Sequence, residues 1–272
     1  MIVRFWGVRG SIPVSGPGYL RSGGNTSCLE ICHEGERLII DGGTGVRALG
    51  DALGYQPVRL TLLFTHTHWD HIQGVPFFTP AYHPGSHLTF AGPTRDAGSL
   101  HQVLSSQMRP PMFPVLLDDL SAKIDFLPIE EGQVFETGPF RVSSIDLFHP
   151  DGIRAYRIEA GGQVFVHATD VEHGDQIDER LLRFAEGADL LAHDAQYTVD
   201  EYTGRGGPSR RGWGHATWCD AVEVARQAGV RQLALFHHDP RRMDAAVDAI
   251  EADAAARLPG TVAAREGAVF SL

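Results

Sequence analysis

The residues with the clearest chemical potential lie in Thr65-His66-Thr67-His68-Trp69-Asp70-His71, where three imidazoles and a carboxylate follow the apolar run 60–64. Alternate residues of a strand share a face, and a tight turn brings the others round, so these side chains converge on a small volume. Imidazole and carboxylate suit Zn²⁺, Mn²⁺ or Fe²⁺, and the spacing is too short for one ion to take all four. The segment predicts two adjacent metal ions rather than a cluster of core histidines, each of which would need its own buried partner.

The same residues, His66-Thr67-His68-Trp69-Asp70-His71, resemble the H-x-H-x-D-H signature of the metallo-β-lactamase superfamily of hydrolases. The resemblance covers almost the whole chain. It implies an α/β fold, specifically a four-layer αβ/βα sandwich whose halves each contribute ligands. We therefore expect residues 1–272 to form one domain, and this length is ample for a well-buried core.

The resemblance implies three further ligands at distant strand ends, namely His149, Asp170 and His237. Asp170 could serve equally as a helix N-cap, but its two oxygens also allow it to bridge two cations. His238 is the alternative to His237; we choose the first residue after the apolar run and expect His238 to have a supporting or structural role.

The complete assignment places one ion on His66, His68 and His149, the second on Asp70, His71 and His237, and Asp170 between them. Each ion then keeps an open position. A water shared by the two ions would lose a proton near neutral pH, and the ions would clamp the attacked group. The predicted chemistry is hydrolysis, with two divalent ions as cofactors, zinc first and manganese or iron as alternatives.

The resemblance also implies a catalytic role for His215. This residue ends the segment Gly212-Trp213-Gly214-His215, which precedes a predicted helix that leads into the His237 strand. Phosphodiesterase members of the superfamily, notably RNase Z, have a histidine at the matching place, where it is thought to stabilise charge on the phosphate or assist the leaving group. Asp70 could also handle the proton of the bridging hydroxide. The alternative for His215 is a helix-terminal residue without a catalytic part.

Asp41 resembles the superfamily's second-strand aspartate, which orients a metal ligand without binding the metal itself. The residues that follow, Gly43-Thr44-Gly45-Val46-Arg47-Ala48, fit a G-x-G-x-x-A dinucleotide fingerprint. No acidic residue closes the next strand, so we do not expect a nucleotide cofactor.

Four further polar residues lie beside predicted strand ends. Arg9 and Asn25 belong to glycine-rich turns and could contact an anionic substrate or brace their loops. His193 and Asp194 could position His215 or be purely structural. The sequence leaves both alternatives open.

The net charge is −11 and the pI is near 5.6, which disfavours a long nucleic acid as partner because phosphate binding needs a basic face. A small anionic substrate remains compatible. Arg205, Arg210 and Arg211 lie in the glycine-rich loop 203–214, either a solvated loop or a mobile lid that offers a guanidinium to phosphate.

Cys28, Cys32 and Cys219 are an odd number, and the first two are too far apart on one strand face to bond. Reduced thiols suit a cytoplasmic protein. The N-terminus reads as a strand without a secretion signal, and no apolar window is long enough for a membrane span. The resemblance also makes a homodimer an expectation.

Strand-like runs occur at residues 2–6, 28–33, 37–40, 60–64, 87–90, 123–127, 140–147, 154–160, 163–167, 190–192 and 232–236. Helical periodicity covers residues 46–52, 178–186, 216–227 and 243–255. Residues 100–120 show no clear period and predict a loop or insertion bordering the site.

The first motif alone does not identify the substrate. The combination of His215 with a late histidine ligand, and of Asp170 where other families have a cysteine, resembles the phosphodiesterase and RNase Z branch. We therefore predict a phosphodiesterase for a small diester such as a cyclic nucleotide. The alternatives are an ester, lactone or thioester hydrolase, a tRNA-processing nuclease, and a non-catalytic metal or ligand sensor. A flavodi-iron redox enzyme is disfavoured because its motif has Glu at the position of His68.

Overall fold

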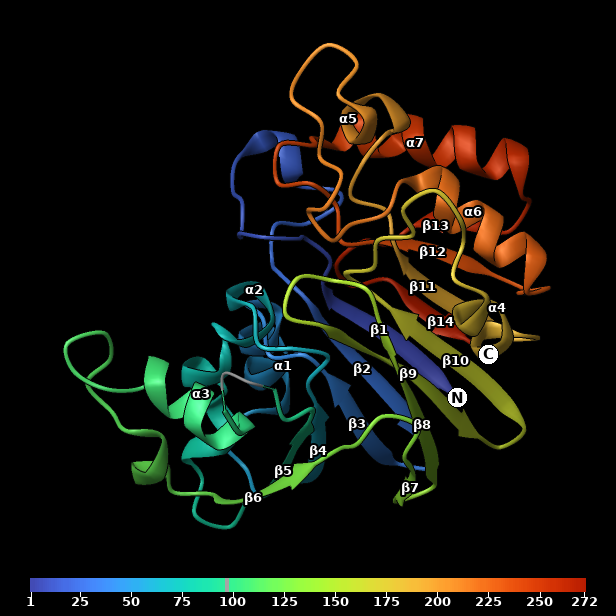
Figure 1. The fold of residues 1–272 in the computed structure, drawn as a ribbon. Helices are drawn as coiled ribbons and strands as arrows, with labels where there is room; N and C mark the ends of the chain where they lie inside the picture. Colours follow the sequence, from blue (N-terminus) through green and yellow to red (C-terminus); the bar gives the residue numbers. More distant parts are fainter. Residues whose placement is uncertain (96–97) are drawn as a thin grey trace.

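Two mixed β-sheets, each of seven strands over the residues that the structure describes (1–95 and 98–272), pack face to face in this computed structural model (Figure 1). The first sheet has the order β14 (Val269–Ser271), β1 (Ile2–Gly7), β2 (Cys28–His33), β3 (Glu36–Ile40), β4 (Arg59–Leu63), β5 (His87–Gly92) and β6 (Lys123–Pro128). The second has the order β13 (Thr261–Ala263), β12 (Leu233–Phe236), β11 (Leu190–Asp194), β10 (Gln163–Ala168), β9 (Ile153–Ala160), β8 (Phe140–Leu147) and β7 (Val134–Thr137).

Helices cover the outer side of each sheet (Figure 1). The first sheet carries α1 (Gly45–Leu53), α2 (Trp69–Ile72) and α3 (Leu100–Gln107). The second carries α4 (Glu179–Ala185), α5 (Val199–Thr203), α6 (Trp218–Gln227) and α7 (Asp244–Arg257). The result is the predicted four-layer αβ/βα sandwich.

Three apolar layers hold the four structural layers together. Between the sheets, fully buried side chains such as Phe5, Tyr156 and Phe236 pack against one another. Leu49 and Phe90 belong to the layer between the first sheet and its helices, and the layer outside the second sheet is built in the same way. Because both faces of each sheet are buried, most central strands read as continuous apolar runs, as expected for buried parallel strands.

Strand direction determines where polar side chains gather. Strands β3 to β6 are parallel neighbours, as are β10 to β13, while β8 and β10 run the same way because each is antiparallel to β9. The carboxyl ends of β8, β10 and β12 therefore lie at one edge of the second sheet. The residues that follow β4 lie beside the residues that follow these three strands, so β4 ends at the same edge of the sandwich.

The predicted strands are confirmed within one or two residues at each end. The helix predicted at 216–227 begins at Trp218, because the Thr217 side chain accepts the backbone N–H of Asp220 and caps the helix. The prediction of a loop over residues 100–120 is wrong in its first part. Ser99 and Gln102 form a capping box there and begin α3.

Besides α3, the α-helices and strands that the sequence did not predict are short: α2, α5, β7, β13 and β14. Segments of this length have little intrinsic periodicity, and their partners in the sandwich stabilise them. The three cysteines are free, as predicted. Over the described part of the chain, no helix combines the length and apolar character needed to cross a bilayer.

Candidate metal centre

The metal-binding motif occupies the connection that follows β4. Residues 64–68 are irregular, and His68 then precedes the single-turn helix α2, which carries Asp70 and His71. The short helix replaces the tight turn that the sequence predicted, and its side chains Asp70 and His71 are buried. His149 follows β8, Asp170 follows β10 and His237 follows β12.

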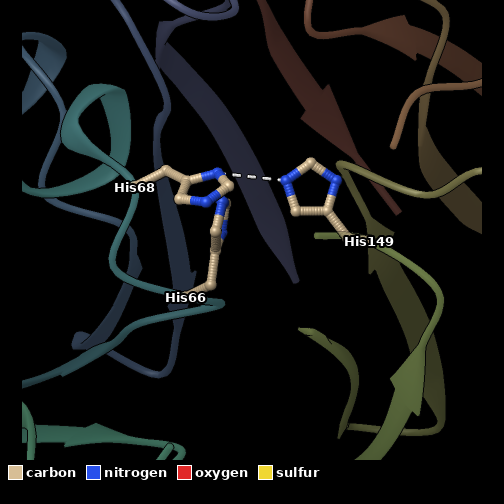
Figure 2. A group of neighbouring side chains, drawn as sticks. All are labelled: His66, His68 and His149. Atoms are coloured by element: carbon tan, nitrogen blue, oxygen red, sulfur yellow. Dashed lines mark hydrogen bonds between the residues drawn. The ribbon is translucent and has the colours of Figure 1, made fainter. Parts of the chain in front are cut away.

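One group at this edge consists of His66, His68 and His149, which offer nitrogens that all lie within 4.8 Å of one another. Figure 2 shows the three rings converging from the β4 connection on one side and the end of β8 on the other. The closest approach is 3.0 Å between His68 Nδ1 and His149 Nε2. Three imidazoles at such distances are a suitable donor set for a borderline divalent ion.

The second group consists of Asp70, His71, Asp170 and His237, which are all buried and meet the same 4.8 Å limit. Nε2 of His237 lies 3.1 Å from Asp70 Oδ2 and 3.4 Å from Nε2 of His71. This mixed set of imidazole and carboxylate donors lies directly beside the first.

Asp170 joins the two groups through its separate oxygens. Oδ1 lies 3.8 Å from Nε2 of both His66 and His149. Oδ2 lies 3.3 Å from Nε2 of His71 and 3.2 Å from Nε2 of His237. One oxygen therefore faces each group, which is the arrangement that a carboxylate shared by two ions requires.

Three of the candidate histidine ligands are oriented by hydrogen-bond acceptors that contact Nδ1 of the ring. His71 Nδ1 lies 2.7 Å from Asp41 Oδ2, and His149 Nδ1 lies 2.7 Å from the Gly214 carbonyl. His237 Nδ1 lies 2.8 Å from an oxygen of the Gln196 side chain. An Nδ1–H that donates to such an oxygen leaves Nε2 free to bind a metal ion.

The protonation of the groups indicates a site that is incomplete without cations. Burial, then the proximity of His71, lowers the pKa of His66 well below its ordinary value, and His66 Nε2 has no hydrogen-bond partner. Burial opposes protonation of His71, but the carboxylates of Asp170, Asp70 and Asp41 together outweigh it and raise the pKa of His71 well above its usual range. A divalent ion would replace the proton of His71, and a second ion would bind the unpartnered nitrogen of His66, so the residues fit a metal centre.

The backbone also has unusual conformations at this edge. Asp41, Asp170 and His237 have φ values of 62°, 50° and 61°. A side chain in this left-handed region costs roughly 1–3 kcal/mol, which the surrounding structure must offset. The strand ends are therefore held in strained turns that direct these three side chains toward the cluster.

His215 lies at the rim of the second sheet and adjoins both groups. Its Nδ1 lies 2.8 Å from Asp194 Oδ2 and 3.9 Å from Asp170 Oδ1, and its ring stacks on His237 with centroids 5.0 Å apart. Burial lowers the pKa of His215, but Asp194, with smaller contributions from Asp170 and Asp70, outweighs burial and raises the pKa to about 8. Because α6 begins only at Trp218, Asp194 and not the helix terminus holds this histidine.

The structure distinguishes His193 from Asp194, and His238 from His237, by their contacts. Asp194 contacts His215, whereas His193 pairs with His173 at 3.2 Å between their Nε2 atoms and does not contact His215. His238 points away from the cluster, and its Nε2 lies 2.9 Å from the Ala264 carbonyl. His237 is thus the neighbour that joins the cluster.

Arg9 and Asn25 brace loops and do not face the cluster. The fully buried Arg9 guanidinium donates to the carbonyls of Gly23 and Arg242 at 2.8 and 2.7 Å. The Asn25 amide donates to Glu266 at 3.1 Å. These contacts favour the bracing alternative for both residues, and Arg9 already uses its donors within the protein.

The arginines of the 203–214 loop are also engaged. Their carboxylate partners are Asp200 for Arg205 at 3.1 Å, Asp239 for Arg210 at 2.9 Å and Asp175 for Arg211 at 2.7 Å. These pairs favour the alternative of an ordinary loop over a lid that carries free guanidinium groups.

Two residues beside the cluster escaped sequence analysis, Gln196 and Glu172. Gln196 supports His237, and Glu172 accepts hydrogen bonds from the backbone before His215. Neither belongs to a local motif. The only signal in the sequence is that each follows a predicted strand within a few residues, Gln196 after β11 and Glu172 after β10.

A cleft of about 630 Å³ opens beside the first group. Among the described residues it is lined by His66, His68, Arg95, Val103 and Asp151.

A protein-family model and a known enzyme both match this chain. The model of the beta-lactamase superfamily domain matches residues 36–238, which include all seven candidate ligands. Ribonuclease Z of Gemmatimonas aurantiaca is 26% identical over 314 residues, covering 100% of this chain and 96% of that protein.

Solved structures share the fold over the full length. The metallo-beta-lactamase fold protein YhfI from Bacillus subtilis aligns with a TM-score of 0.74 and 21% identity, covering 99% of this chain and 98% of its own. A diphosphatase from the PhnP family aligns with a TM-score of 0.71 and 17% identity, covering 100% and 97%.

Proposed function

Because the chain belongs to the metallo-β-lactamase superfamily, in the branch that includes ribonuclease Z, we propose that it is a metal-dependent phosphodiesterase acting on a small phosphodiester, for example a cyclic nucleotide. The observation that carries the proposal is the position of Asp170 between two groups of imidazoles, with His215 beside both. A two-ion site with an adjacent proton donor suits an in-line displacement at phosphorus.

We assign one divalent ion to His66, His68 and His149, a second to Asp70, His71 and His237, and Asp170 to both. When bound, the ions would supply an acidified water and compensate charge on the diester. Zinc is the first choice because imidazole dominates the donor set, with manganese and iron as alternatives.

The chain's own residues orient and protonate the substrate. Asp194 holds the His215 ring through Nδ1, which leaves Nε2–H as the donor that can protonate a leaving oxygen or stabilise charge on the phosphate. Asp70 accepts the backbone N–H of Ser11 at 2.6 Å, which fixes the carboxylate beside His237. From there Asp70 can accept the proton of the attacking water.

A ribonuclease is the second candidate, because a protein named ribonuclease Z matches the entire chain. That name favours an RNA substrate over a small diester. The acidic net charge of −11 and the paired loop arginines favour the small diester. A substrate comparison must therefore decide between the two.

The first experiment measures hydrolysis of bis(p-nitrophenyl) phosphate by protein reconstituted separately with Zn²⁺ and Mn²⁺. Asp70→Asn should abolish turnover. His215→Ala should reduce it only by the part that charge stabilisation contributes, because the p-nitrophenolate leaving group needs no proton. The control His101→Gln, at an exposed pair with Asp118, should behave as wild type. No turnover with two ions bound would refute the proposal and direct the search to lactones and thioesters. If diesters are cleaved, parallel assays with 2′,3′-cyclic nucleotides and a tRNA precursor distinguish the two candidates.

A further inference from the structure

Glu172 lies two residues after the bridging Asp170 and is 7% exposed. Its Oε1 accepts hydrogen bonds from the Gly212 N–H and the Tyr202 hydroxyl, both at 2.7 Å. Its Oε2 accepts the Gly214 N–H, also at 2.7 Å. These three donors are neutral, so the carboxylate acts here as an acceptor of directed hydrogen bonds.

Gly214 links this carboxylate to a candidate ligand. Its N–H donates to Glu172, and its carbonyl accepts the Nδ1–H of His149 at 2.7 Å. The residue has a φ of 85°, and a Cβ there would lie 2.2 Å from His149 Nδ1 and 2.3 Å from Pro150 Cδ. The backbone of Gly214 is thus confined between the carboxylate on one side and the imidazole on the other.

Glu172 is tied to the same ligand by a second route. Its backbone N–H donates to the Phe148 carbonyl at 3.0 Å, directly before His149. His215 directly follows Gly214 in the chain. One residue therefore connects the end of β8, which carries His149, to the loop that carries His215.

We propose that Glu172 is a positioning residue that fixes the ring orientation of His149 through the Gly214 peptide and, by the same hydrogen bonds, the position of His215. The effect on His149 requires only that this residue binds metal. The effect on His215 rests on the proposed function. Loss of a group that orients a metal ligand typically weakens metal binding 10- to 100-fold.

The experiment titrates metal-free protein with Zn²⁺ against a chromophoric chelator, using wild type, Glu172→Gln, Glu172→Ala and Tyr202→Phe. His149→Ala identifies which of the two binding steps belongs to the His149 site. Glu179→Gln, a largely exposed glutamate on α4, is the matched control. Circular dichroism of the metal-free variants verifies folding, and the NMR resonance of the His149 Nδ1 proton in the zinc form reports its hydrogen bond.

We expect Glu172→Gln and Glu172→Ala to weaken the His149 step about 10- to 100-fold and to shift that proton resonance. Glutamine retains the size of the glutamate side chain but places its amide N–H against a backbone N–H that needs an acceptor. If Glu172→Ala does not fold, the zinc affinity of Glu172→Gln therefore tests the proposal by itself. Tyr202→Phe keeps both glycine hydrogen bonds and should stay within threefold of wild type.

Unchanged zinc affinity and an unchanged proton resonance in a folded Glu172→Gln variant would overturn the inference. An equal loss in Tyr202→Phe would also overturn it, because the carboxylate would then act through α5. Weakened zinc binding in a protein that cleaves no diester would support the role of Glu172 at His149 and refute the phosphodiesterase proposal separately.

Discussion

Asp194 and His215 form a buried pair, with 2.8 Å between Oδ2 and Nδ1, at the edge where the second sheet meets the metal centre. The other oxygen of Asp194 accepts the backbone N–H groups of Gln196 and Ala216 at 3.0 and 3.2 Å. The carboxylate is therefore fixed on both sides. This pairing orients the histidine and favours its protonated form.

Asp194→Asn should lower diester turnover on the order of 100-fold, because the loss of the carboxylate removes the orientation and charge that support a general acid. The loss should be greater for a methyl ester than for a p-nitrophenyl ester, whose leaving group needs no proton. Steady-state kinetics on both diesters tests this. Asp175→Asn, at an exposed pair with Arg211, is the control. Equal losses on both esters would assign His215 to charge stabilisation.

Asp170→Asn should reduce the bound metal from two ions to one per chain. The substitution removes the negative charge and replaces one oxygen that faces a group of imidazoles with an amide nitrogen, which does not bind a divalent ion. Elemental analysis after dialysis against buffered zinc measures the stoichiometry. Retention of two ions would show that Asp170 does not bridge them.

Gly10→Ala should disturb His237 without replacing any candidate ligand. A Cβ at residue 10 would lie 2.4 Å from His237 Cε1 and Nδ1 and 2.7 Å from Gln196 Oε1, so the ring and the Gln196 side chain that supports it must move. We expect the affinity for the ion at Asp70, His71 and His237 to fall at least about tenfold. Gly207→Ala, where a Cβ meets no atom within 4 Å, is the control in the same zinc titration. Wild-type affinity in Gly10→Ala would contradict the placement of His237.

Asp244→Asn should destabilise the metal-free protein by about 1.5–3 kcal/mol, the contribution of hydrogen bonds to a buried charged group. Burial opposes ionisation of Asp244, but hydrogen bonds from Ser22 and the Arg21 N–H outweigh it and lower its pKa to about 2. The unfolded chain binds this proton near pH 4, so the contribution is present above pH 4 and is lost as the pH falls toward 2.

Urea unfolding followed by tryptophan fluorescence at several pH values between 2 and 6 measures this effect. The difference in the free energy of unfolding between wild type and Asp244→Asn should shrink as the pH falls through that window. Asp253→Asn, exposed on the same helix, should stay within about 0.5 kcal/mol of wild type. A difference that is independent of pH would contradict the assigned cause.

The sequence by itself determined the strands, the longer helices and the ligand candidates. Apolar runs bounded by Gly and Pro specify buried strands locally, and the density of His and Asp after residues 60–64 indicates metal without any knowledge of the fold. The resemblance then supplied the order of the distant ligands. These signals depend on neighbours in the chain, which a sequence displays directly.

Only the tertiary structure decided which of two adjacent histidines joins the cluster and which residues orient the candidate ligands. His237 and His238 are adjacent and chemically identical, yet the left-handed backbone at His237 directs one ring into the cluster and leaves the other against the Ala264 carbonyl. The partners Gln196, Glu172 and Asp194 reach their histidines from different strand ends or through a loop peptide. Such contacts depend on the packing of two sheets and on backbone torsions, and a sequence pattern encodes neither.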